Sequence, residues 1–152
     1  MIVYLVHHGD AVGPDVDPQR PLSVDGRAHV ERLAAEAAAR GARPAVVWHS
    51  GKLRAKQTAE AFWRACNALA ELSATRDLQP DDPPQWIAER LPGEQRDVLI
   101  AGHFPHLPHL LMLLTRSNDE PVPSGVEVFP PHGLVALQSD DGETWKEAWR
   151  LV

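Results

Sequence analysis

The sequence lacks several features that would place it in a specialised class of protein. Its 152 residues include one cysteine, Cys66, so no disulfide can form within the chain, as suits a reducing compartment. The net charge is −6 and no run of lysine and arginine occurs, which disfavours binding to nucleic acid or to an anionic membrane. No basic segment with a cleavage site leads into the first apolar stretch, so we expect no secretory signal and a cytoplasmic location.

Long hydrophobic runs are also missing. The longest, at 107–114, is interrupted by Pro108 and His109 and is too short to cross a bilayer. Neither an internal repeat nor a low-complexity linker divides the chain, and its length suits one domain. A domain of that size buries roughly 68–70% of the surface of its unfolded chain, so it needs neither disulfides nor a structural metal. We therefore expect a single domain over residues 1–152.

The hydrophobic pattern alternates short buried strands with amphipathic helices. Continuous apolar runs predict strands at 2–6, 45–48 and 98–101. Apolar stripes predict helices at 24–40, 53–69, 86–91 and 106–114. Apolar and polar residues alternate over 126–152, which predicts two or three further strands. The turn signal at Asp141-Gly142 predicts that two of them form a hairpin. This order predicts a three-layer α/β/α sandwich with a mostly parallel central sheet.

Histidine and glycine gather where these strands are predicted to end. The three segments are His7-His8-Gly9, His49-Ser50-Gly51 and Gly102-His103. Ligands of α/β sheets bind outside the carboxyl ends of the strands. Glycine lets backbone amides approach an anion, and imidazole serves as a nucleophile or acid–base group near neutral pH. Arg54, in the first turn of the next helix, is typical of a phosphate site, although a solvated surface arginine is the alternative.

Four motifs then occur in the order of one known family. They are HHGDA from His7, DPQRPLS from Asp17, HSGKLRAKQTAE from His49 and LIAGHFPHL from Leu99. Together they resemble the histidine phosphatase superfamily, whose fold is phosphoglycerate-mutase-like, and within it the SixA-type phosphohistidine phosphatases. The resemblance extends from residue 1 to about 112, and residues 53–59 are its most specific part.

The resemblance implies a role for each matching residue. His8 would be the nucleophile that accepts the phosphoryl group, kept neutral by a hydrogen bond from its other ring nitrogen. Arg54 and His103 would act with it on the phosphoryl group. Phosphate or substrate would be bound by His7, Gly9, Arg20 and Ser50. Water would then hydrolyse phospho-His8, with neither a metal nor an organic cofactor.

Residue 7 departs from the family pattern, which has arginine where this chain has His7. Arginine is always charged and makes bidentate contacts, whereas histidine does neither. Arg54 nearby should disfavour the charged form of His7, and a lost donor costs about 2.7–4 kcal/mol of transition-state stabilisation. We expect a bound phosphate dianion to protonate His7, so that the rate rises as pH falls until His8 is protonated. We also expect His7→Arg to accelerate turnover.

The general acid is not evident from the sequence. The carboxylates where related proteins place such an acid are Asp81, Asp82 and Glu89, and solvated positions are the alternative for all three. A phosphohistidine substrate needs little acid assistance because protonated imidazole leaves readily, which favours a phosphoramidate substrate. The spacing of His103, His106 and His109 lacks the i, i+4 pattern and the nearby acid of a metal site, so we expect no metal.

Three functions are consistent with these residues. The first is dephosphorylation of phosphohistidine on a signalling or carrier protein. The second is hydrolysis of a small phosphoester, and the third is non-catalytic binding of phosphorylated partners, which His7 makes credible. The expected partners are a phosphorylated protein or small molecule, with inorganic phosphate as the product. We expect a monomer that binds neither nucleic acid nor a membrane.

Overall fold

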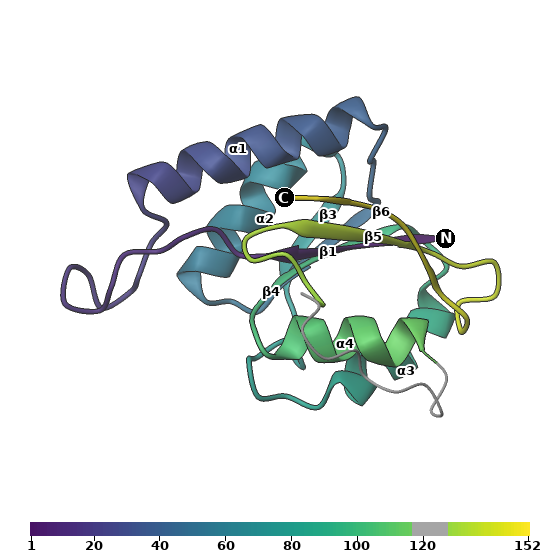
Figure 1. The fold of residues 1–152 in the computed structure, drawn as a ribbon. Helices are drawn as coiled ribbons and strands as arrows, with labels where there is room; N and C mark the ends of the chain where they lie inside the picture. Colours follow the sequence, from purple (N-terminus) through teal and green to yellow (C-terminus); the bar gives the residue numbers. More distant parts are fainter. Residues whose placement is uncertain (117–127) are drawn as a thin grey trace.

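The structure is a computed structural model that describes residues 1–116 and 128–152. In this part of the chain, one six-stranded sheet is covered by helices (Figure 1). The strands are β1 (Ile2–His7), β2 (Val46–His49), β3 (Glu71–Ala74), β4 (Val98–Gly102), β5 (Leu134–Gln138) and β6 (Lys146–Leu151). The helices are α1 (Val24–Ala39), α2 (Leu53–Cys66), α3 (Pro84–Glu94) and α4 (His106–Thr115).

The sheet is mixed, with the strand order β3-β2-β4-β1-β5-β6. Strands β1 to β4 run parallel, β5 runs antiparallel to β1, and β6 runs antiparallel to β5. The predicted α/β sandwich with a mostly parallel sheet is therefore confirmed. The tail forms the predicted hairpin, β5–β6, around Asp141 and Gly142. The first two residues of the predicted tail, 126 and 127, lie outside the described residues.

Helices cover both faces of the sheet, α1 and α2 on one side and α3 and α4 on the other (Figure 1). Tyr4 and Val6 of β1 pack into the core under α1 and α2. Val3 and Leu5 pack into the opposite core under α3 and α4. Because successive strand residues face opposite sides, this double burial explains the continuous apolar run of β1.

Several elements differ from the sequence prediction, among them β3 and the ends of α2 and α3. The sequence predicts no strand at β3, whose side chains are mostly exposed because it lies at the sheet edge and pairs only with β2. Helix α2 ends at Cys66 and not at residue 69, since Asn67 is extended and its Nδ2–H donates to the Pro44 carbonyl. None of the helices described by the structure combines the length and hydrophobicity needed to cross a membrane.

Candidate active site

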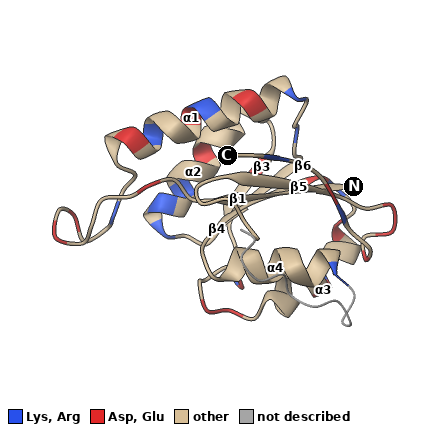
Figure 2. Ribbon diagram, in the orientation of Figure 1, with Lys and Arg blue, Asp and Glu red and all other residues tan. Residues whose placement is uncertain are grey.

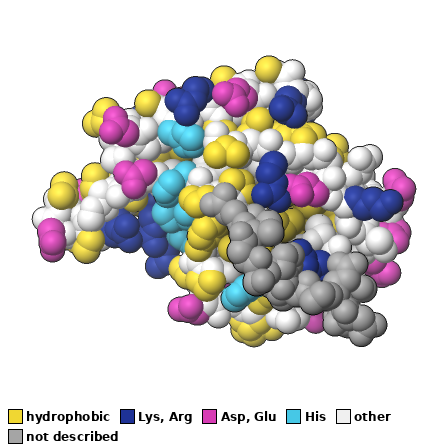
Figure 3. Space-filling view, viewed as in Figure 1, with side chains coloured by type: hydrophobic (Ala, Val, Ile, Leu, Met, Phe, Trp, Pro, Cys, Tyr) yellow, Lys and Arg dark blue, Asp and Glu magenta, His cyan; other side chains and the backbone are white. Residues whose placement is uncertain are grey.

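Strands β2, β4 and β1 are neighbours, so their carboxyl ends meet at one edge of the sheet. His8 follows β1, Ser50 follows β2 and His103 follows β4. The ring centroids of His8 and His103 are 5.1 Å apart, and Ser50 Oγ lies 2.6 Å from His103 Nε2. The structure therefore groups residues from all three predicted strand ends. Figure 3 shows histidine side chains gathered on this part of the surface, next to lysine and arginine side chains.

His8 is held in one tautomer by its own backbone. Its Nδ1 lies 2.7 Å from the Gly9 carbonyl oxygen, and since a carbonyl only accepts, Nδ1 carries the proton of the neutral ring. Burial lowers the pKa of His8 to about 4, helped by the charge of Arg54 and opposed by the Gly9 hydrogen bond. At neutral pH His8 is therefore uncharged, with its lone pair on Nε2.

Gly9 connects the end of β1 to helix α2. The Gly9 N–H donates to Thr58 Oγ1 at 3.0 Å, and the Thr58 hydroxyl donates to the Arg54 carbonyl at 2.8 Å. A Cβ on Gly9 would lie 2.4 Å from Cγ2 of Val30 on α1, so the close packing of that helix requires glycine. Thr58 thus fixes the first turn of α2 relative to His8.

Helix α2 also holds the loop that carries Arg20. Gln57 Oε1 accepts the backbone N–H of Leu22 at 2.7 Å. The sequence reasoning assigned no role to Gln57 or Thr58, although both lie in the family-specific stretch 53–59. Their position in that motif was the one feature of the sequence that could have indicated a role for them.

Arg54 and Arg20 provide the permanent positive charge. Arg54 lies in the first turn of α2, and its buried Nε–H has no acceptor among the residues that the structure describes. Burial and the nearby Arg20 lower the pKa of Arg54. Arg20 has a φ of 51° and donates from Nε to the Val12 carbonyl at 3.0 Å. Figure 2 shows lysine and arginine gathered at the start of α2, an arrangement that favours an anion.

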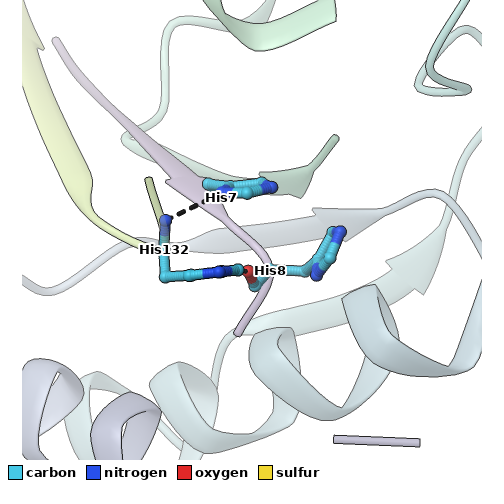
Figure 4. Close-up of side chains that lie close together, drawn as sticks. All are labelled: His7, His8 and His132. Carbon is cyan, nitrogen blue, oxygen red and sulfur yellow. Dashed lines mark hydrogen bonds between the residues drawn. The ribbon is translucent and has the colours of Figure 1, made fainter. Parts of the chain in front are cut away.

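His7 is stacked between two aromatic rings. Phe104 lies 4.0 Å from it on one side and His132 lies 4.7 Å from it on the other, both with interplanar angles of 10°. His7 Nδ1 accepts the backbone N–H of His132 at 2.7 Å (Figure 4). Because an N–H only donates, the neutral ring of His7 carries its proton on Nε2.

This geometry gives His7 a neutral ring. Burial, followed by the charges of His8 and His132, lowers the pKa of His7 to about 3. Protonation of Nδ1 would also break the hydrogen bond from His132. The pKa of His8 is lowered to about 4, so both rings are neutral near pH 7, and the rise in rate that a bound phosphate dianion would cause by protonating His7 stays a prediction. His7 offers a neutral Nε2–H donor.

His132 is a member of the cluster to which the sequence reasoning assigned no role. It immediately precedes Gly133 and β5, and its φ of 54° is left-handed. Its Nδ1 lies 2.7 Å from the His8 carbonyl oxygen, so this nitrogen carries a proton and donates. His132 follows β1 by more than a hundred residues, and the antiparallel pairing of β5 with β1 brings it to the site. The His-Gly pair before a predicted strand was its only signal in the sequence.

The rings of His7, His8 and His132 do not converge on a metal position. One nitrogen of each lies within 4.8 Å of the others. However, the rings of His7 and His132 are stacked and nearly parallel, so their in-plane lone pairs do not meet. The His7 Nδ1 lone pair is also used by the N–H of His132. A zinc ion at about 2.0–2.1 Å from each nitrogen requires convergent lone pairs, so the three rings do not form a zinc site.

His103 and Ser50 form a second buried contact of the site. Ser50 Oγ accepts the backbone N–H of Lys52 at 3.3 Å, which leaves its hydroxyl proton free to bind His103 Nε2. Burial, followed by the charges of His8 and Arg54, lowers the pKa of His103 to about 3. His103 Nδ1 is buried without a partner among the described residues. A neutral His103 is thus oriented beside His8.

The carboxylates considered as general acids lie elsewhere. Asp81 is exposed in the loop before α3, and Glu89 is exposed on α3. Neither is among the charges that act most strongly on His8 or His103. Asp82 accepts a backbone N–H within its own loop. The structure therefore does not bring these three carboxylates to the nucleophile.

Comparison with solved structures identifies similar folds, although no protein-family model and no curated protein matches the sequence. The protein histidine phosphatase SixA, solved with tungstate, has a TM-score of 0.83 at 22% identity, covering 99% of this chain and 96% of that one. A putative phosphohistidine phosphatase SixA from Agrobacterium tumefaciens has a TM-score of 0.78 at 25% identity, covering 99% and 97%. A phosphoglycerate mutase from Plasmodium falciparum has a TM-score of 0.72 at 16% identity, covering 97% and 88%.

These similarities extend over nearly the whole chain, including the tail that the sequence motifs did not cover. They confirm the resemblance drawn from the four motifs. The chain therefore has the phosphoglycerate-mutase-like fold of the histidine phosphatase superfamily, with SixA phosphohistidine phosphatases among its structural neighbours.

Proposed function

We propose that the protein is a phosphatase that forms a phosphohistidine intermediate on His8. The observation that carries the proposal is the tautomer of His8, whose Nδ1–H is bound to the Gly9 carbonyl so that Nε2 has a free lone pair. The unpaired Nε–H of Arg54 next to this ring supports an anionic substrate. A SixA neighbour that binds tungstate, a phosphate analogue, supports the same class of ligand.

In the first step, His8 Nε2 attacks phosphorus and the leaving group departs. Arg54 and Arg20 balance the charge of the phosphoryl group. His103 and the Nε2–H of His7 would donate to its oxygens, since their rings lie 5.1 and 4.5 Å from the ring of His8. At residue 7 a single neutral donor would then replace the bidentate arginine contact. In the second step, water attacks phosphorus, the P–N bond breaks, and its electron pair returns to His8 Nε2.

We further propose phosphohistidine on a signalling or carrier protein in the cytoplasm as the substrate. The three carboxylates considered as acids lie away from His8, so a poorly leaving alkoxide would receive no assistance from them. The nitrogen of a phosphohistidine leaves more readily. Small phosphoesters with acidic leaving groups remain accessible substrates by the same reasoning.

Non-catalytic binding of phosphorylated proteins is the second candidate. It is favoured by one observation, the replacement of the expected arginine by a stacked and neutral His7. Such a protein would retain the cations Arg54 and Arg20 and would bind phosphate without turning it over.

Phosphate release from a phosphohistidine peptide and from p-nitrophenyl phosphate separates the two candidates. We expect the wild type to release phosphate and His8→Ala to release none, while His109→Ala, a change at an exposed histidine of α4, behaves as the wild type. Circular dichroism would check that His8→Ala is folded. A wild type that binds the peptide but releases no phosphate would refute the catalytic proposal and support the binding module.

A further inference from the structure

Each step of the proposed reaction transfers a proton that His8 neither donates nor accepts. The leaving nitrogen of a phosphohistidine must gain one, and the attacking water must lose one. His8 keeps its own proton on Nδ1, bound to the Gly9 carbonyl. Arg54 and Arg20 remain protonated throughout and cannot exchange one. The reaction therefore needs another titratable group beside the phosphoryl position.

His132 is the titratable side chain that lies beside His8 and is half-exposed. Its Nδ1–H donates to the His8 carbonyl, so the neutral ring has its lone pair on Nε2. In Figure 4 the rings of His132 and His7 lie one above the other, with the ring of His8 to one side of both. The other two histidines of the site differ, since His7 and His103 are buried.

The rings of His132 and His8 are near neighbours, with centroids 6.1 Å apart. One nitrogen each of His7, His8 and His132 lies within 4.8 Å of the others. The contacts of the described residues include no hydrogen bond that joins the ring of His132 directly to the ring of His8. A separation beyond the 2.7–3.2 Å of a direct hydrogen bond, roughly, suits two groups that act on the same bound molecule.

We infer that His132 is the acid–base residue of this site, an inference that rests on the proposed phosphatase function. In the first step, protonated His132 gives its Nε2 proton to the leaving nitrogen as the P–N bond of the substrate breaks and the P–Nε2 bond to His8 forms. In the second step, neutral His132 takes one proton from the attacking water. The oxygen of that water bonds to phosphorus, the bond to His8 breaks, and hydrogen phosphate leaves while His132 is again protonated for the next cycle.

Titratable groups of β1, of the loop after it and of α1 face His132. His7 of β1 and His8 of the loop are neutral at pH 7 by the geometry described above. His29 of α1 lies 3.2 Å from the His132 carbonyl oxygen and accepts from Arg32 on its other nitrogen. Asp10 and Asp25 line a cleft of about 380 Å³ together with His132.

The variant His132→Asn tests this role while preserving the structural contacts. Asparagine tolerates the left-handed backbone of this position, its backbone N–H still reaches His7, and its amide replaces the donor to the His8 carbonyl. It cannot exchange a proton. The matched control is His109→Asn, the same substitution on an exposed face of α4.

The experiment follows the two steps separately with p-nitrophenyl phosphate, whose leaving group needs no acid. We expect His132→Asn to release one equivalent of p-nitrophenolate in a burst and then to accumulate acid-labile phosphoenzyme, with hydrolysis slowed by about 10²-fold or more. Turnover of a phosphohistidine peptide should fall at least as much, the pH profile of kcat should differ from that of the wild type, and added imidazole should restore hydrolysis.

Three outcomes decide the matter. Slow hydrolysis of the phosphoenzyme with rescue by imidazole supports the assignment. Hydrolysis by His132→Asn at the rate of the wild type and of His109→Asn refutes the role of His132 but leaves the phosphatase intact. A wild type that forms no phosphoenzyme and releases no phosphate refutes the proposed function, and the role of His132 falls with it.

Discussion

The side chain of His7 is held by contacts with residues distant in the sequence, which could not be predicted from its position in the motif. The ring of His7 fills a flat space between Phe104 and His132, and its Nδ1 is the acceptor for a backbone N–H. Arginine has a flat guanidinium that fits such a stack but has no acceptor atom. The two residues are therefore not interchangeable here, even though the family pattern places arginine at this position.

The variant His7→Arg should gain phosphate affinity and lose stability. The new charge strengthens binding of a phosphate dianion and should accelerate turnover, whereas the His132 N–H loses its acceptor, at a cost of about 1–3 kcal/mol in the free energy of unfolding. Urea denaturation and inhibition by inorganic phosphate measure the two effects. His7→Gln, which retains an acceptor and adds no charge, is the control. Unchanged stability of His7→Arg would show that the His132 N–H does not depend on residue 7.

Thr58 connects two elements of the fold through one hydroxyl. It accepts from Gly9 at the end of β1 and donates to the Arg54 carbonyl in the first turn of α2. Thr58 is completely buried, so no water replaces a lost contact. The spacing between His8 and Arg54 depends on this link.

Replacing Thr58 by valine keeps its shape and removes both hydrogen bonds. The buried Gly9 N–H is then unpaired, so we expect a loss of about 1–3 kcal/mol in the free energy of unfolding and a lower kcat. Thr58→Ser retains the hydroxyl and should preserve kcat more fully than valine. Denaturation curves and phosphate release measure both variants. Equal kcat values for valine and serine would contradict the positioning role.

The sequence predicts those elements whose burial is uniform and misses those that depend on distant contacts. β1 and β4 have continuous apolar runs because both faces are covered, and their strand-end histidines could be placed together from the sheet rule alone. β3 is an exposed edge strand without such a run. His132 and the tautomer of His7 could not be predicted, because both follow from the pairing of β5 with β1 across more than a hundred residues.

At the scale of the whole molecule, the buried histidines make stability depend on pH. Burial lowers the pKa of His7 and of His103 to about 3, whereas the unfolded chain has its ordinary value of about 6.5. Between these values the unfolded state binds more protons, so stability falls as pH falls below about 6.5 and levels off below about 3. Each residue then contributes a loss of about 2 kcal/mol by pH 5.

Urea denaturation at pH 7 and pH 5 measures this loss. We expect His7→Gln, which has no titrating group, to reduce the difference between the two pH values by about 2 kcal/mol. His109→Gln, a change at an exposed histidine, should leave the difference unchanged. A difference in His7→Gln as large as in the wild type would mean that His7 is protonated in the folded protein at pH 5.

The strand order also sets the course of folding during synthesis. β1 is the first of the six strands to leave the ribosome, yet it lies inside the sheet, where its partners are β4 and β5. Nearly a hundred residues are translated before β4 follows, and the edge that pairs with β5 is covered later still. An apolar strand that stays unpaired during this time can aggregate. The topology therefore leaves β1 without both neighbours for most of translation, and His7 and His8 at its end acquire their full surroundings only when the hairpin β5–β6 is complete.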